Sequence, residues 1–165
     1  MLFLDKKKEP FELKKGIGDD TPLLVEMYET FQPKGRYQGL PPANTDACTS
    51  WLRHLFSVGE NFLALRNGRM IGHASLLPDQ TLRDGEYLVF VHQHHRCRGV
   101  GTLLTRSAMD RARTLELTDI WLTVDADNFI AIRLYRNFGF RFCDEKCFHS
   151  ERKMMLHLEG DGKPC

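Results

Sequence analysis

The chain has 165 residues, of which 42% are hydrophobic and 27% are charged, and its net charge is +1. This length predicts a single domain spanning residues 1–165, with a core from about residue 10 to 158 and short flexible ends. A near-neutral charge argues against nucleic acid as a partner, and the absence of a long apolar run argues against a membrane. The five cysteines include no C-x-x-C pair, which is typical of a cytoplasmic protein.

Patterns in the first third predict one strand and two helices. Residues 11–15 are expected to form a short strand, and Asp19 to Pro22 contains the capping residues and early proline of a helix start. Apolar side chains then recur at helical spacing up to Phe31. Residues 32–45 hold three prolines and two glycines, which predicts an irregular loop before a second helix over 46–56.

The middle of the chain predicts a hairpin, a buried strand and a helix. Asn67-Gly68 separates two apolar segments and favours a type I′ turn, because both residues tolerate a positive φ. The nearly continuous apolar run from Glu86 to His92 indicates a strand covered on both faces. From Val100, small and apolar residues recur as the stripe of an amphipathic helix.

The last third predicts a strand, a helix and two further strands. Apolar residues alternate over 120–124, and Asp127-Asn128 then caps a helix that Gly139 ends. Strands near 140–148 and 153–158 are expected to pair through His149-Ser150. The order βααβββαβαββ predicts an α+β fold, with a mixed, mostly antiparallel central sheet flanked by helices.

The segment "VHQHHRCRGVGTLL", residues 91–104, joins the buried strand to the next helix. A glycine-rich turn at a helix start directs backbone N–H groups at one point, which favours phosphate binding. The segment lacks the spacing of a P-loop or a dinucleotide fingerprint. Its histidines and Cys97 lie too close in sequence to surround one ion, so we expect exposed histidines and no metal site.

The same segment carries a family resemblance. Arg96-x-x-Gly99-x-Gly101 resembles the [QR]-x-x-G-x-[GA] pyrophosphate loop of GNAT-type N-acetyltransferases. Downstream, "DADNFIAIRLYRNFGF" (Asp125–Phe140) is similar to the family's N-x-x-A-x-x-[LF]-Y-x-x-x-G-F segment. Gln93 and Cys97 stand where the family often has proline and glycine, and neither change removes a backbone donor.

The resemblance implies that residues 1–165 form one N-acetyltransferase domain with acetyl-CoA as co-substrate. It places the pantetheine along strand backbone near Phe90 and Val91, and gives Asn128 and Tyr135 cofactor contacts. The implied pyrophosphate loop consists of Arg96, Cys97, Arg98, Gly99, Val100, Gly101 and Thr102, in which backbone amides bind and the arginines add charge.

The implied reaction is direct transfer of an acetyl group from the thioester to a primary amine. A lysine-like amine has a pKa near ~10.4, so a base must remove its proton and a donor should protonate the leaving thiolate. Tyr135 suits the donor and Glu86 is the first choice of base, with His73 and Asp125 as alternatives. A core tyrosine and a solvated carboxylate are the structural alternatives for these two residues.

The acceptor is predicted only as an amine-bearing small molecule or protein, and the chain as a monomer or homodimer. Phe31 to Tyr37 resembles the F-x-x-x-x-R-Y stretch of bacterial protein-lysine acetyltransferase domains. The alternative function is a non-catalytic acyl-CoA-binding sensor that keeps the loop without the chemistry.

Overall fold

A computed structural model describes residues 1–34, 40–143 and 150–158 of the chain. The strands are β1 (Leu2–Leu4), β2 (Pro10–Lys15), β3 (Glu60–Arg66), β4 (Arg69–Asp79), β5 (Asp84–Val91), β6 (Asp119–Asp125), β7 (Arg141–Phe142) and β8 (Glu151–His157). The α-helices are α1 (Thr21–Glu29), α2 (Thr45–Val58), α3 (Val100–Thr114) and α4 (Phe129–Asn137).

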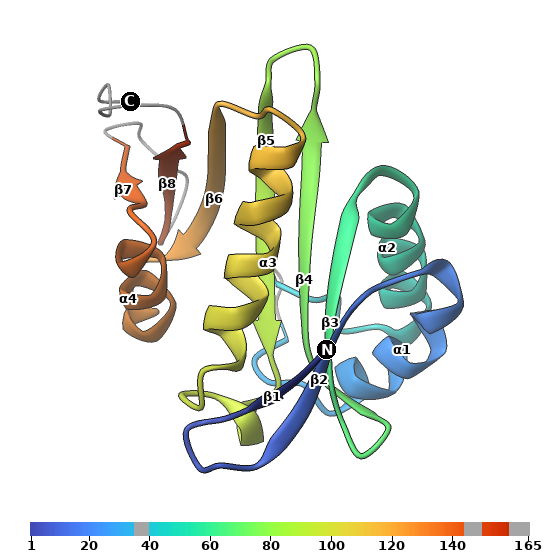
Figure 1. Cartoon of the computed structure of the whole chain (residues 1–165). Helices are drawn as coiled ribbons and strands as arrows, with labels where there is room; N and C mark the ends of the chain where they lie inside the picture. Colours follow the sequence, from blue (N-terminus) through green and yellow to red (C-terminus); the bar gives the residue numbers. More distant parts are fainter. Residues whose placement is uncertain (35–39, 144–149, 159–165) are drawn as a thin grey trace.

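The strands form one eight-stranded sheet in the order β1-β2-β3-β4-β5-β6-β8-β7 (Figure 1). All neighbouring strands are antiparallel except β5 and β6, which run parallel. One buried cluster joins α3 and α4 to the sheet, and a second joins α1 and α2 to it. The predicted mixed, mostly antiparallel sheet flanked by helices is therefore confirmed.

Local signals of the sequence set several of these boundaries. Asn67 and Gly68 have φ of 51° and 76°, as the predicted type I′ turn between β3 and β4 requires. Asn44 caps α2 by accepting hydrogen bonds from the Asp46 and Ala47 amides, and Asn128 caps α4 through the Ala131 amide. These side chains use backbone donors that the first turn of a helix leaves free.

The N-terminal strand β1 was absent from the predicted order, which began the core near residue 10. Leu2–Leu4 instead pairs with Pro10–Glu12 of β2, and the Met1 ammonium donates to the Leu13 carbonyl at 2.8 Å. Only Phe3 faces the core, 6.0 Å from the Phe11 ring, whereas Leu2 and Leu4 are 72% and 64% exposed. Three residues with one partly buried side chain are too short to display strand periodicity.

Four sequence predictions concern residues outside the described ranges, wholly or in part. They are the Arg36-Tyr37 part of the acceptor-loop resemblance, the 144–148 part of the strand expected near 140–148, the His149 side of the last turn, and the flexible C-terminal end beyond residue 158. Across the described residues, no helix is long and apolar enough to cross a membrane.

The parallel pair β5 and β6 provides the opening that positions the site. Their pairing joins only Asp84–Glu86 to Asp119–Trp121, near the start of each strand. Beyond these residues the two described strands separate toward their carboxyl ends, as Figure 1 shows in the lower half of the sheet. Backbone groups on the facing edges are consequently available to a ligand.

Candidate active site and cofactor cavity

A cavity of about 560 Å³ lies where β5 and β6 separate, within the size range of small-molecule sites. It reaches from the N-terminus of α3 to the inner face of α4. Nine of the predicted cofactor-binding residues line it: Phe90, Val91, Arg96, Cys97, Gly99, Gly101, Thr102, Asn128 and Tyr135. The structure thus brings together two motifs that are about 30 residues apart in the chain.

The turn before α3 has the geometry of an anion-binding loop. Cys97 has φ of 60° and Gly99 has φ of 94°, so the chain reverses sharply before α3 begins at Val100. A Cβ on Gly101 would lie 3.4 Å from Leu134 Cδ2 and 3.5 Å from Val91 Cγ2, which is ordinary van der Waals contact, so Gly101 lies beside both α4 and β5. The first amides of α3 have no intrahelical acceptor, and the helix dipole adds partial positive charge beside them.

The two arginines of this loop are engaged with protein groups. Arg96 donates from Nε to the Val91 carbonyl at 2.9 Å and from Nη2 to the Gln32 carbonyl, and its guanidinium lies 5.3 Å from the centre of the Phe31 ring. Arg98 donates to Glu9 Oε2 at 2.8 Å and does not line the cavity. The two arginines therefore connect the loop to the end of β5, to Gln32 and to Glu9. The sequence motif did not indicate this structural role.

Val100 also lies outside the cavity lining, because its side chain is buried in the core between α3 and the sheet. Its amide belongs to the first turn of α3, so any contact with a ligand there would come from the backbone.

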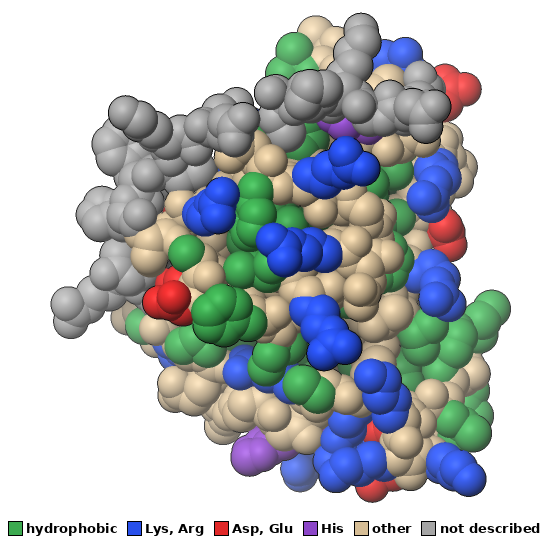
Figure 2. Space-filling view, turned by 90° about the vertical axis from the view of Figure 1, so that its left-hand side faces the viewer, with side chains coloured by type: hydrophobic (Ala, Val, Ile, Leu, Met, Phe, Trp, Pro, Cys, Tyr) green, Lys and Arg blue, Asp and Glu red, His purple; other side chains and the backbone are tan. Residues whose placement is uncertain are grey.

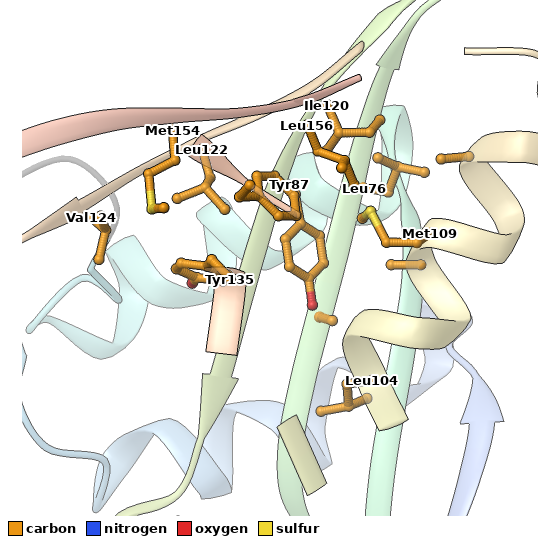
Figure 3. Packing of buried hydrophobic residues seen from close by; sticks show 14 of the residues in the cluster. Leu76, Tyr87, Leu104, Met109, Ile120, Leu122, Val124, Tyr135, Met154 and Leu156 are labelled. Atoms are coloured by element: carbon orange, nitrogen blue, oxygen red, sulfur yellow. The ribbon is translucent and has the colours of Figure 1, made fainter. Parts of the chain in front are cut away.

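Tyr135 occupies the inner face of α4 and lines the cavity. Its ring packs 6.4 Å from Tyr87 and 5.8 Å from Phe140, in the cluster shown in Figure 3. Burial raises the pKa of Tyr135 well above the usual value of 10, so the phenol keeps its proton at neutral pH. Tyr135 is therefore a buried, packed tyrosine that also lines the cavity.

Glu86 lies on β5 between Leu77 of β4 and Trp121 of β6, outside the cavity lining. Strand alternation places it on the same face as Leu88 and Phe90, opposite Tyr87. The carboxyl is half-buried, and desolvation raises its pKa. A raised pKa makes this carboxylate a stronger proton acceptor.

The two alternative bases differ in access to the cavity. His73 is fully buried, and its ring nitrogens bond Tyr28 Oη and Asn61 Oδ1, each at 2.9 Å. Burial lowers the pKa of His73 to about 3. Asp125 lines the cavity, and its carboxylate accepts from the Asp127 amide at 3.0 Å and the Ser150 hydroxyl at 3.3 Å.

The histidines of the loop bond to protein groups. His92 Nε2 lies 3.1 Å from Thr30 Oγ1, and His95 Nδ1 lies 3.3 Å from Arg66 Nη1. His94 is exposed as expected, whereas His92 and His95 are half-buried. No group of three or more His, Cys, Asp or Glu side chains that could hold a metal ion occurs among the described residues.

Sequence reasoning missed several lining residues. Ile130 and Leu134 are one helical turn apart on α4, and Val89 shares a strand face with Val91, so periodicity could have located them. Lys6 also lines the cavity, and no motif or periodicity marks it. Its position depends on the unexpected strand β1.

The chain belongs to the acetyltransferase (GNAT) family, whose sequence pattern matches residues 24–140. It is 31% identical over 70 residues to the "Probable spermine N(1)-acetyltransferase" of Bacillus subtilis subsp. natto (strain BEST195), and 45% identical over 49 residues to the streptothricin acetyltransferase of Streptomyces lavendulae. The matches cover 42% and 30% of this chain, and only 46% and 26% of those relatives.

Solved structures share the fold at low sequence identity. The GNAT domain of S. lividans PAT superposes with a TM-score of 0.78 at 15% identity, with 96% of both chains covered. The yncA structure from Salmonella typhimurium, which contains acetyl-CoA, has a TM-score of 0.72 at 20% identity. That match covers 94% of this chain and 98% of the other.

Proposed function

We propose that this chain is an N-acetyltransferase that moves an acetyl group directly from acetyl-CoA to a primary amine. The observation that carries the proposal is the cavity between β5 and β6, with the start of α3 at one end and Tyr135 in its lining. Family membership and the acetyl-CoA in the yncA structure support the cofactor. The names of the two curated relatives support an amine acceptor.

The amides from Cys97 to Thr102 would hold the pyrophosphate, and the free edge of β5 near Phe90 and Val91 would bind the pantetheine. No metal is required, because the thioester is already reactive toward a neutral amine. The amine nitrogen bonds to the acetyl carbon as the carbon–sulfur bond breaks.

Two residues would move protons in this reaction. Tyr135 protonates the departing thiolate and regains its proton from solvent. Glu86 removes the amine proton, acting through water because its side chain does not line the cavity. We further propose that residues 1–165 form one such domain, and that it works in the cytoplasm, with Cys48 and Cys97 as free thiols.

The test is release of free thiol from acetyl-CoA in the presence of an amine panel. The panel holds polyamines, an aminoglycoside-like amine, a lysine peptide and a peptide with a free N-terminus. We expect thiol release above the amine-free rate with at least one member, and an acetylated product by mass spectrometry. Binding of acetyl-CoA without turnover on any amine would favour the sensor function instead.

A further inference from the structure

The turn between β1 and β2 brings a lysine to the phosphate end of the cavity. Lys6 lines the cavity, and a Cβ built on Gly99 would lie 3.9 Å from Lys6 Cγ. The Lys6 amide donates to the Arg98 carbonyl at 2.9 Å, which fixes this backbone against the loop. We propose that the Lys6 ammonium binds a phosphate group of coenzyme A, an inference that rests on the proposed function.

Arg96, the other cationic side chain in the described cavity lining, already binds protein groups. The Arg96 guanidinium donates to two backbone carbonyls and stacks on Phe31, and Arg98 points away to Glu9. Within the described residues, the Lys6 ammonium has no hydrogen bond or ion pair. Lys6 thus supplies a full positive charge beside the α3 amides, and an ammonium is well suited to phosphate as a point charge.

An ion-pair network holds the Lys6 backbone in place. Asp5 Oδ2 lies 2.7 Å from Arg66 Nη2, with both side chains almost inaccessible, and Glu9 Oε2 lies 2.7 Å from Arg66 Nη1. Glu9 also bridges to Arg98 of the loop at 2.8 Å. Ion pairs of Asp5 and Glu9 therefore connect the β1–β2 turn to the loop before α3, and they hold Lys6 close to Gly99.

The Asp5 carboxyl also organises the turn itself. It accepts from the Lys7 amide at 2.8 Å and the Glu9 amide at 3.0 Å. Burial alone would raise the pKa of Asp5, but the hydrogen bonds from Arg66 and these amides lower it to about 2. The carboxylate is ionised at neutral pH, and the network that positions Lys6 is intact under assay conditions.

The experiment measures the Kd for acetyl-CoA by calorimetry in the wild type and in Lys6→Ala, Lys6→Arg and Lys7→Ala. Lys7 is the matched control, because it is an exposed lysine in the same turn that does not line the cavity. We expect Lys6→Ala to weaken binding about tenfold at low salt, and less at high salt, because the contact is a charge on a partly exposed site. Lys6→Arg should recover most of the affinity and Lys7→Ala should change it less than about twofold.

Dephospho-CoA, which lacks the 3′-phosphate, identifies the phosphate that Lys6 contacts. If Lys6→Ala weakens the binding of CoA but not of dephospho-CoA, Lys6 contacts the 3′-phosphate. An equal loss of affinity for both ligands would show that it contacts the pyrophosphate. If the wild type binds acetyl-CoA and the Kd values of Lys6→Ala and Lys7→Ala are the same, the role of Lys6 is overturned and the proposed function is not. A wild type that does not bind acetyl-CoA would overturn the proposed function as well.

Discussion

Replacing Tyr135 by phenylalanine removes one hydroxyl and keeps the ring that packs on Tyr87 and Phe140. We expect Tyr135→Phe to lower kcat by about 10²-fold with little change in the Kd for acetyl-CoA, because the donor to the leaving thiolate is lost. A thiol with pKa near ~8.5 leaves moderately well unaided, so a better leaving thiol should partly rescue the variant.

Tyr87→Phe is the matched control. Its hydroxyl donates to Thr105 Oγ1 at 2.9 Å in the same buried cluster, but Tyr87 does not line the cavity. Its loss should cost about 1 kcal/mol of folding free energy and leave turnover intact. If Tyr135→Phe behaves like Tyr87→Phe in steady-state kinetics, Tyr135 is a packing residue only.

Glu86 is tested by the pH dependence of the rate. We expect Glu86→Gln to reduce the rate at neutral pH by about 10²-fold, because the variant cannot accept the amine proton. The loss should shrink as pH rises toward the amine pKa near ~10.4, since the amine then deprotonates without help. A constant ratio of variant to wild-type rates from about pH 6 to 10 would move the role to Asp125, and Asp125→Asn would then show the pH-dependent loss.

At the scale of elements, the sequence predicted what local patterns encode. Asn67-Gly68 defined a hairpin and Asn128 a helix cap, because turns and caps depend on a few adjacent residues. The glycine loop and the α4 motif located most of the cavity, since each lies within one turn or one helix.

The parts that the sequence could not predict depend on contacts distant in the chain. β1 is held by three backbone pairings and one partly buried aromatic side chain, Phe3, so it leaves no periodic signal. The partners of Arg98 lie about 90 residues away, at Asp5 and Glu9, which no spacing rule connects to the loop. Lys6 enters the cavity only because that distant contact forms.

At the scale of the whole molecule, a net charge of +1 conceals an uneven distribution. The face in Figure 2, where α4, β7 and β8 lie, displays many Lys and Arg side chains and few acidic ones. Arg133 and Arg136 are exposed on α4, the helix that also contributes Ile130 and Leu134 to the cavity. Local positive potential beside the proposed phosphate site would favour a ligand with several phosphates, which the overall charge alone does not indicate.

Global stability should depend on pH through His73, which links both helices of one layer to the sheet. Its ring bonds Tyr28 of α1 and Asn61 of β3, and Asn61 Nδ2 donates to the Leu55 carbonyl of α2 at 3.0 Å. Since the Asn61 oxygen must accept, His73 Nε2 carries the proton and Nδ1 accepts from the Tyr28 hydroxyl. This neutral tautomer has no place for a second proton.

Burial lowers the pKa of His73 to about 3 in the folded chain, whereas an unfolded histidine has a pKa near 6.5. Below pH 6.5 the unfolded state binds a proton that the folded state does not. The stabilisation is therefore complete above pH 6.5 and is lost toward pH 3, at about 1.4 kcal/mol per pH unit. Urea unfolding of wild type and His73→Gln between about pH 7.5 and 4.5 measures this contribution, because all other titrating groups are shared. We expect the variant to be less stable at pH 7.5, by about 1–3 kcal/mol for the disrupted hydrogen bonds, and the difference to narrow as pH falls. Parallel stability curves for the two proteins would show that His73 does not titrate as its burial requires.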